Sequence, residues 1–193
     1  MLKIGVIGYG YWGPNIVRNF STANGSCVTM VCDMNSQTLK NKVKKAYPQI
    51  KTTTEIDELI KDPEVDAVAI VTPVFTHFEI AQKALEAGKS IFVEKPFTYT
   101  VSEAEQLVNL AEKKKLKIMV DHTFLYTGAV KKIRQLIDDG TLGDLYYFDS
   151  MRINLGLFQH DVNVVWDLAP HDISIMDYVI GKKPQAVVAT GAG

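Results

Sequence analysis

The chain has 193 residues, enough for one large domain or for one domain and part of a second. Its 21 basic and 22 acidic side chains give a formal net charge of -1, which excludes a general electrostatic attraction for nucleic acid or for an anionic membrane. The sequence runs from Met1 into a strand-like segment without a secretory signal, and it has no apolar run of the roughly 20 residues that span a bilayer. We therefore expect a cytoplasmic protein. With no overall charge to attract a large polyanion, we expect its partner to be a small molecule.

The first 121 residues alternate apolar runs of strand length with helical patterns. We predict strands at residues 3–7, 27–33, 67–72, 90–94 and 117–121. We predict helices near residues 13–22, 36–47, 76–87 and 102–115, the last two capped by Thr76 and Ser102. Apolar strands joined by crossover helices are typical of a parallel sheet with helices on both faces. We therefore expect residues 1–121 to form an α/β domain with a doubly wound parallel sheet.

From about His122 the pattern changes. A helix is predicted over residues 128–138, a turn over 140–144 and a long strand over 145–156. A polar stretch follows, then a helix over 168–180 and a strand-like piece from Ala186. Two strands and two helices would leave a sheet with bare edges. We therefore treat residues 122–193 as an incomplete second domain.

Three glycines follow the first predicted strand and open the first predicted helix: Gly8, Gly10 and Gly13. The first allows a tight turn, the second lets the backbone approach a pyrophosphate, and the third lets the helix pack on the strand. Free N–H groups at the start of the helix then face the phosphates. This spacing, in this context, predicts a Rossmann-type site for a nicotinamide dinucleotide.

Four more residues complete the expected dinucleotide site: Tyr9, Tyr11, Trp12 and Asp33. The first three lie in the glycine turn, where backbone N–H groups bind the phosphates, and the rings of Tyr11 and Trp12 are expected beside the cofactor. Asp33 ends the second predicted strand, where its carboxylate would accept hydrogen bonds from the adenine ribose and repel a 2′-phosphate. NAD is therefore expected in preference to NADP. The alternative is a turn and a strand-ending aspartate in a doubly wound protein of another kind.

Polar residues also follow the third and fourth predicted strands. Thr72-Pro73 ends one strand and is followed by His77 in the next helix, and Glu94-Lys95-Pro96 ends the other. Ligands of open α/β sheets bind at this edge, so Lys95 is placed to reach the reactive end of the cofactor. For Lys95, the alternative is a surface lysine before a turn proline.

Asp167 and His171 are four residues apart and share one side of a predicted helix. A carboxylate can orient an imidazole, and imidazole exchanges protons near neutral pH. The alternative is that Asp167 caps the helix over residues 168–180, with Pro170 in the first turn and His171 on the exposed face. The two interpretations are compatible, because a capping carboxylate can also be catalytic.

Together, the glycine turn, Thr72-Pro73, Glu94-Lys95-Pro96 and the pair Asp167 and His171 resemble the Gfo/Idh/MocA family of NAD(P)-dependent sugar and cyclitol dehydrogenases, over essentially the whole chain. The resemblance implies a catalytic group of Lys95, Asp167 and His171. His171 would act as the base, Lys95 would stabilise the alkoxide, and Asp167 would orient the imidazole or bind a neighbouring hydroxyl. It also implies that Thr72, Pro73, His77 and Glu94 bind the cofactor, and we expect no metal site.

Two segments, residues 122–126 and 166–172, are similar to the family branch that oxidises nucleotide-activated amino sugars at C3, of the UDP-N-acetylglucosamine 3-dehydrogenase type. The family's second domain is an α+β domain with an open, mostly antiparallel sheet that binds substrate and forms the interface of a homo-oligomer, a dimer or a tetramer. By this resemblance residues 122–193 are its first part, in a fragment or a natural truncation. Ser174 and Ala169 depart from the family pattern of an aspartate and a glycine, which affects substrate details.

Five residues before Asp167 could face a substrate, although an ordinary strand or loop residue is the favoured interpretation of each: Arg152, Asn154, His160, Asp161 and Asn163. Competing functions are a cyclitol dehydrogenase, a dinucleotide-sensing regulator without catalysis, and a dihydrodiol or biliverdin type of reductase. The presence of Lys95, Asp167 and His171 favours an enzyme, because a sensor would not need all three, and the leading hypothesis is a dehydrogenase of a sugar or nucleotide sugar.

Overall fold

The computed structural model describes residues 1–153 and 162–191 and forms two compact units, Met1–Asp121 and His122–Gly193. Among the residues described, no helix has both the length and the apolar character needed to cross a membrane.

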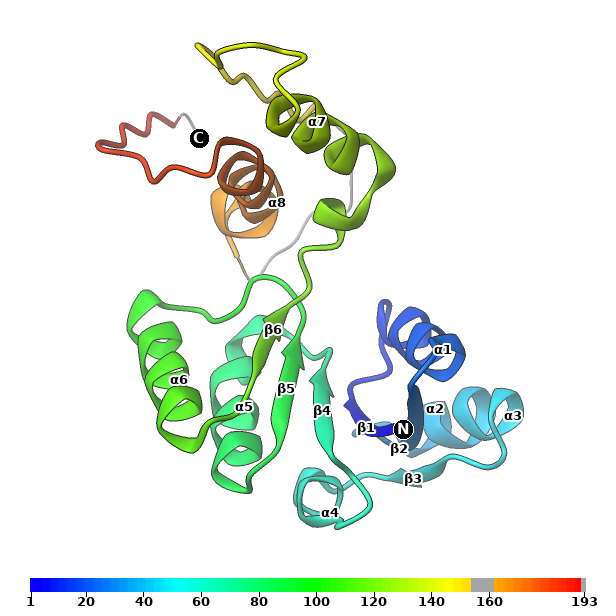
Figure 1. Cartoon of the computed structure of the whole chain (residues 1–193). Coiled ribbons are helices and arrows are strands. Elements are labelled where there is room, and N and C mark those ends of the chain that lie inside the picture. The colour runs from blue at the N-terminus through cyan, green and yellow to red at the C-terminus, as the bar shows by residue number, and fades with distance from the viewer. Residues whose placement is uncertain (154–161, 192–193) are drawn as a thin grey trace. The chain divides into compact units, whose positions relative to one another are not determined.

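The first unit contains one sheet of six parallel strands in the order β3-β2-β1-β4-β5-β6 (Figure 1). The strands are β1 (Leu2–Ile7), β2 (Ser26–Cys32), β3 (Lys51–Thr53), β4 (Ala67–Ile70), β5 (Ser90–Val93) and β6 (Ile118–Val120). The chain builds outward from β1 to β3, then crosses back to β4 and builds outward on the other side. The expected doubly wound parallel sheet is confirmed, and ligands bind such sheets at the point where the strand order reverses.

Helices cover both faces of this sheet, because successive strand residues point to opposite faces. One core lies under α1 (Gly13–Thr22) and the segment formed by α2 (Ser36–Thr38), the π-helical η1 (Leu39–Val43) and α3 (Lys44–Ala46). The other lies under α4 (Ile56–Lys61), α5 (His77–Glu86) and α6 (Val101–Lys114). Fully buried strand residues such as Val6, Val31, Val68 and Ile70 place the sheet between the two cores.

Some local features differ from those predicted. The short edge strand β3 and helix α4 have no counterpart among the predicted elements, because β3 consists of Lys, Thr and Thr and carries no apolar pattern. The helix α6 is capped by Thr100, not by Ser102: the Thr100 hydroxyl accepts the N–H of Glu103, whose carboxylate accepts the N–H of Thr100. Thr76 does not cap α5 with its side chain, because a 3-10 turn, η2 (Val74–Thr76), leads into that helix.

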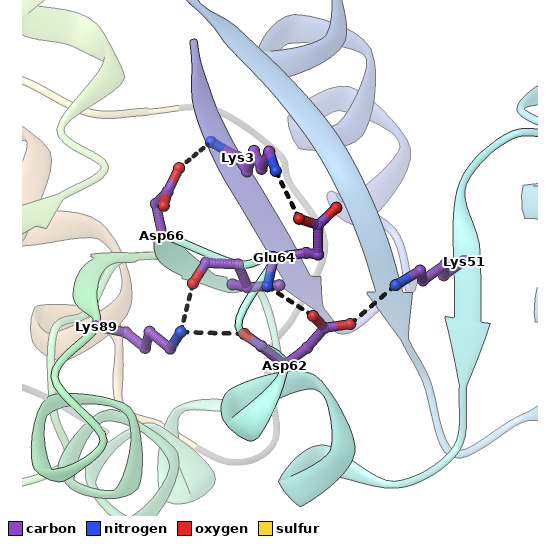
Figure 2. Close-up of polar contacts among 7 residues, drawn as sticks. Lys3, Lys51, Asp62, Glu64, Asp66 and Lys89 are labelled. Atoms are coloured by element: carbon purple, nitrogen blue, oxygen red, sulfur yellow. Dashed lines mark hydrogen bonds and ion pairs between the residues drawn. The ribbon is translucent and has the colours of Figure 1, made fainter.

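The strands of the sheet begin at one edge, here called the amino edge, and end at the opposite, carboxyl edge. Ion pairs and backbone contacts stabilise the amino edge (Figure 2). Lys3 in β1 reaches Glu64 with its ammonium, at 2.8 Å, and its N–H donates to Asp66, also at 2.8 Å. Lys89, just before β5, donates to the carbonyl oxygens of the loop that precedes β4, and Lys51 at the start of β3 pairs with the same loop. This network ties the loop over residues 62–66 to three strands.

The second unit consists of the 3-10 turn η3 (Thr123–Tyr126), α7 (Gly128–Asp138) and α8 (Val164–Ile180). Arg134 of α7 donates to the carbonyl oxygen of Tyr178 in α8 at 2.8 Å. In the described parts of the two segments predicted as strands, 145–153 and 186–191, no strand is formed. A strand needs a neighbour for its backbone N–H and C=O groups, and the described residues of this unit supply none.

Candidate functional site

The turn between β1 and α1 depends on glycine at two positions. Gly8 has a φ of +98°, and a Cβ there would lie 2.4 Å from the carbonyl oxygen of Val71. A Cβ on Gly13 would lie 2.6 Å from the carbonyl oxygen of Gly8, so this glycine lets α1 pack on the turn. A Cβ on Gly10 would meet no atom within 4 Å, so the space beside Gly10 is open. The turn therefore offers bare backbone at Gly10, as the close approach of a pyrophosphate would require.

The amino end of α1 suits an anion. Trp12, at the N-cap, makes no capping hydrogen bond with its side chain, and the first turn of α1 contains no acidic residue. Pro14 occupies the first turn, where a missing N–H costs nothing. The N–H groups and the helix dipole at this end favour negative charge, so α1 meets the electrostatic requirement of a dinucleotide phosphate.

The carboxylate of Asp33 is held directly beside the glycine turn. One oxygen accepts the N–H of Tyr9 at 2.7 Å, and the other accepts the N–H of Asn35 at 2.8 Å. Its own N–H donates to the carbonyl of Thr53 in β3, at 3.2 Å. Because each carboxylate oxygen has a further lone pair, Asp33 can still accept hydrogen bonds from ribose hydroxyls.

The three aromatic residues of the turn have different environments. Tyr11 and Trp12 are 83% and 38% exposed, and their rings stack with centroids 6.2 Å apart. Tyr9 is buried in the core under α1, where burial raises the pKa of its hydroxyl. Its N–H is already bound to Asp33. The Tyr9 N–H therefore positions Asp33, whereas Tyr11 and Trp12 are exposed beside the turn, and a cofactor contact of Tyr9 stays a prediction.

His77 is a buried connection between two loops at the carboxyl edge. It is 1% exposed, with Nε2 lying 2.8 Å from the carbonyl oxygen of Thr72 and Nδ1 lying 3.0 Å from that of Pro96. Burial lowers the pKa of the imidazole, although the carbonyl contacts oppose this shift. The ring of His77 is thus engaged by backbone carbonyl groups, and a cofactor contact of this residue stays a prediction. The ring holds Thr72 and Pro96, the residues that flank the site.

Glu94 and Lys95 directly follow β5. The Lys95 N–H donates to a carboxylate oxygen of Glu94 at 3.0 Å, and the peptide bond between Lys95 and Pro96 is cis. Glu94 also forms a side-chain hydrogen bond with Asp121, the residue that follows β6. Burial, then the charge and hydrogen bond of Asp121, raise the pKa of Glu94 to about 8. Asp121 was not among the candidate residues predicted from the sequence, although its position at the end of a predicted strand would have indicated that it lies at the edge where ligands bind.

In the second unit, Asp167 and His171 lie on α8. Asn163 caps this helix by accepting the N–H of Trp166 at 2.9 Å, so Asp167 lies in the first turn of the helix and is not its N-cap. Pro170 lies within the helix as well. His171 is 9% exposed, not on an open face, and its ring meets that of Phe124 edge to face with centroids 4.7 Å apart.

Asp172, the residue after His171, is paired with Arg152. The two side chains form an ion pair of 2.8 Å, and Ser150 donates a further hydrogen bond of 2.7 Å to the same carboxylate. The hydrogen bond from Arg152 is the main cause that lowers the pKa of Asp172. Arg152 and Asn163 are thus structural contacts of this unit. Asn154, His160 and Asp161 lie outside the described residues.

The structure assembles the expected residues in two groups. One edge of the first sheet brings together the strand ends that carry Gly8, Asp33, Thr72 and Lys95. The second unit carries Asp167 and His171 on a single helix. The first group defines a dinucleotide-binding α/β domain of the dehydrogenase type.

Comparison with known proteins identifies the family. The model of the oxidoreductase family with an NAD-binding Rossmann fold, GFO_IDH_MocA, matches residues 2–122. The chain belongs to the Gfo/Idh/MocA oxidoreductase family, and the cofactor that this fold binds is a nicotinamide dinucleotide.

Three similar proteins illustrate the range of this family. UDP-N-acetylglucosamine 3-dehydrogenase of Acidithiobacillus ferrooxidans is 31% identical over 193 residues, which is 98% of this chain and 58% of that protein. The scyllo-inositol 2-dehydrogenase (NADP(+)) IolW of Bacillus subtilis is 27% identical, over 97% of this chain and 54% of its own length. The crystal structure of apo scyllo-inositol dehydrogenase from Lactobacillus casei superposes with a TM-score of 0.69 at 26% identity, covering 74% of this chain and 43% of that one.

The chain spans about half the length of the relatives it matches. Sugar and inositol dehydrogenases both occur among them, at similar levels of identity.

Proposed function

We propose that the chain belongs to an NAD-dependent dehydrogenase that transfers a hydride between the nicotinamide and a ring secondary hydroxyl of a sugar, most closely a nucleotide sugar. The observation that carries the proposal is the placement of Lys95. It follows β5 at the edge of the sheet that also presents the glycine turn and Asp33. A cation at this edge suits a reaction that develops negative charge on a substrate oxygen.

The bound dinucleotide supplies the hydride acceptor, and the residues of the chain supply the rest. The glycine turn and the amino end of α1 hold the pyrophosphate, and Asp33 receives the ribose hydroxyls. Lys95 hydrogen-bonds the substrate hydroxyl and stabilises the alkoxide. The imidazole of His171 takes the hydroxyl proton, and Asp167, one helical turn earlier, orients that imidazole or binds a neighbouring hydroxyl. Reduction of a keto sugar uses the same groups in reverse.

The preference for NAD over NADP rests on Asp33. Its carboxylate is fixed by two N–H groups, so it cannot easily turn away from a 2′-phosphate. Repulsion between these anions favours the cofactor that has a free 2′-hydroxyl. The inositol dehydrogenase of Bacillus subtilis, which is named for NADP, makes this preference worth testing directly.

A cyclitol is the second candidate substrate, because two of the three similar proteins are inositol dehydrogenases. We further propose that the second unit contributes to substrate binding and to a homo-oligomer, and that the protein works in the cytoplasm. A sensor that binds the dinucleotide without catalysis is the alternative from another class of protein.

The test is a panel of UDP sugars, dTDP sugars, myo-inositol and scyllo-inositol, with reduced nicotinamide followed by absorbance. Oxidation of a nucleotide sugar, lost on replacement of Lys95, supports the proposal, and oxidation of inositols alone supports the second candidate. Binding of NAD without turnover of any compound, together with an unchanged cellular phenotype of the Lys95 variant, would favour the sensor.

A further inference from the structure

Two acidic side chains meet at the carboxyl edge of the sheet. Val93 of β5 pairs with Val120 of β6, so the next residues, Glu94 and Asp121, are adjacent across the two strands. Asp121 is 7% exposed, Glu94 is half-buried, and their side chains are hydrogen-bonded. Two carboxyl groups can form such a bond only when one of them carries a proton.

The surroundings of the pair favour this proton. The charged groups that act on Glu94 are Asp121, from β6, and Lys95, the next residue along the chain. The strand on the other side, β4, presents backbone: the Glu94 N–H donates to the carbonyl of Ile70 at 2.9 Å. His77 lies behind the same loops, with its ring bound to the carbonyls of Thr72 and Pro96. Glu94 thus has one carboxyl group and one lysine acting on it, and its ionisation would add a negative charge next to the Asp121 carboxyl group.

We propose that Glu94 and Asp121 share one proton in the folded protein and thereby set the charge beside Lys95, where the nicotinamide is bound. This inference rests on the proposed function for the place of the nicotinamide. With the proton, the pair carries one negative charge, which balances the ammonium of Lys95. Without it, the site gains a second negative charge. Glu94 is thus a positioning residue that acts through charge, not a group that reacts with substrate.

The sign of the effect follows from the charge of the cofactor. The nicotinamide ring is positively charged in NAD+ and neutral in NADH. Loss of the shared proton therefore favours the oxidised form over the reduced form. The same proton also affects folding. The pKa of Glu94 in the folded protein, about 8, lies above its ordinary value of 4.5. The stability that the protonated Glu94 contributes is therefore fully present below pH 4.5 and is lost as the pH rises through about 8.

The first measurement needs no cofactor. Glu94→Gln keeps the shape and the hydrogen bond of the protonated form, and thermal denaturation compares it with the wild type across the pH range. We expect the Gln variant to gain about 5 °C in Tm relative to the wild type as the pH rises from acidic values to above 8. The matched control, Glu105→Gln, removes an exposed carboxylate and should show no such rise. In Asp121→Asn, loss of the neighbouring charge should shift the pH dependence to lower pH.

The second measurement is the ratio of the dissociation constants of NADH and NAD+ as a function of pH, from direct titration. In the wild type, the ratio is expected to rise about fivefold as the pair loses its proton. In Glu94→Gln the ratio should stay constant, because the site cannot gain the extra charge. Other titrating groups are present in both proteins and cancel in the comparison.

The outcomes separate this inference from the proposed function. A Tm difference that is independent of pH in both Glu94→Gln and Asp121→Asn would overturn the shared proton. A pH-dependent Tm difference with the same NADH to NAD+ ratio in wild type and variant would overturn its action on the nicotinamide. Failure of the folded wild type to bind either dinucleotide would contradict the proposed function, and with it the effect on the cofactor, while the Tm measurement would still decide the proton.

Discussion

A lysine lies on either side of β5, and the two lysines make different contacts. Lys89, before the strand, donates to backbone carbonyls of the loop over residues 62–66, among the ion pairs of the amino edge (Figure 2). Lys95, after the strand, lies beside Glu94 and the other residues of the candidate site. The same residue type at opposite ends of one strand thus serves the packing of a loop in one case and a site in the other.

The two edges also differ in how their polar groups are held. The Lys3 and Glu64 side chains of the amino edge are 39% and 59% exposed, and exposed ion pairs contribute little to stability. At the carboxyl edge, His77 and Asp121 are buried, and Gly8 adopts a conformation that other residues avoid. Substitutions should therefore have large effects at the carboxyl edge and small effects at the amino edge.

The largest expected difference in catalytic effect is between substitutions of the two lysines that flank β5, Lys89 and Lys95. Lys95→Met should lower kcat about a thousandfold while leaving NADH affinity within about fivefold, because its charge acts on the developing alkoxide. Lys89→Met should leave kcat unchanged and lower stability by about 1 kcal/mol, since two backbone carbonyls lose their donor. Steady-state kinetics and urea denaturation of both variants check this pair. Equal loss of kcat in both would remove the distinction between the edges.

A second comparison lies within the glycine turn. Gly8→Ala should lower stability by about 3 kcal/mol, because the new Cβ clashes with the Val71 carbonyl and the φ is positive. Gly10→Ala should leave stability within about 0.5 kcal/mol and weaken NADH binding about tenfold, because its Cβ enters open space where the pyrophosphate is proposed to bind. Thermal melts and fluorescence titration separate the two effects. Unchanged NADH affinity in Gly10→Ala would place the phosphates elsewhere.

His77 tests whether buried contacts stabilise the carboxyl edge. His77→Phe keeps a ring but has no N–H, so the Thr72 or Pro96 carbonyl that the neutral imidazole serves loses its donor, and we expect a loss of about 2 kcal/mol in the free energy of unfolding. His77→Gln, which retains a donor, should recover part of this loss. Urea denaturation measures both variants, and a Phe variant as stable as the wild type would show that these contacts are dispensable.

The smallest effect is expected at Lys3. Lys3→Met removes an exposed ion pair with Glu64, and we expect its Tm to stay within about 2 °C of the wild type, with a smaller difference at high salt. NADH affinity should be unchanged. A Tm shift of the size expected for the His77 variant would mean that the amino edge contributes as much stability as the carboxyl edge.

Features with a local chemical cause could be predicted from the sequence. The spacing of Gly8, Gly10 and Gly13 after an apolar strand determines a turn, and the structure shows why two of these positions exclude a side chain. The alternation of apolar strand runs with helical patterns predicted the doubly wound sheet, because this pattern is also set by the local sequence of residues. Asp33 and Lys95 could be selected as candidates from the sequence because each lies at the end of a predicted strand, and the structure places both at the carboxyl edge of the sheet.

Features that depend on distant contacts could not be predicted. The meeting of Glu94 with Asp121 depends on the register of β5 and β6. The sequence also does not reveal that the Tyr9 side chain enters a core and that the His77 ring lies between two backbone carbonyl groups. The start of α8 was placed too late because Pro170 suggested a first turn, whereas Asn163 caps the helix earlier.

The central claim is that the carboxyl edge of the first unit binds a nicotinamide dinucleotide and that Asp33 selects NAD. Titration of the wild type and of Asp33→Asn with NADH and NADPH tests it most directly. The wild type should bind NADH at least about tenfold more tightly than NADPH, and the Asn variant should reduce this preference, because the repulsion of the 2′-phosphate is removed. Equal or tighter binding of NADPH by the wild type would contradict the role given to Asp33.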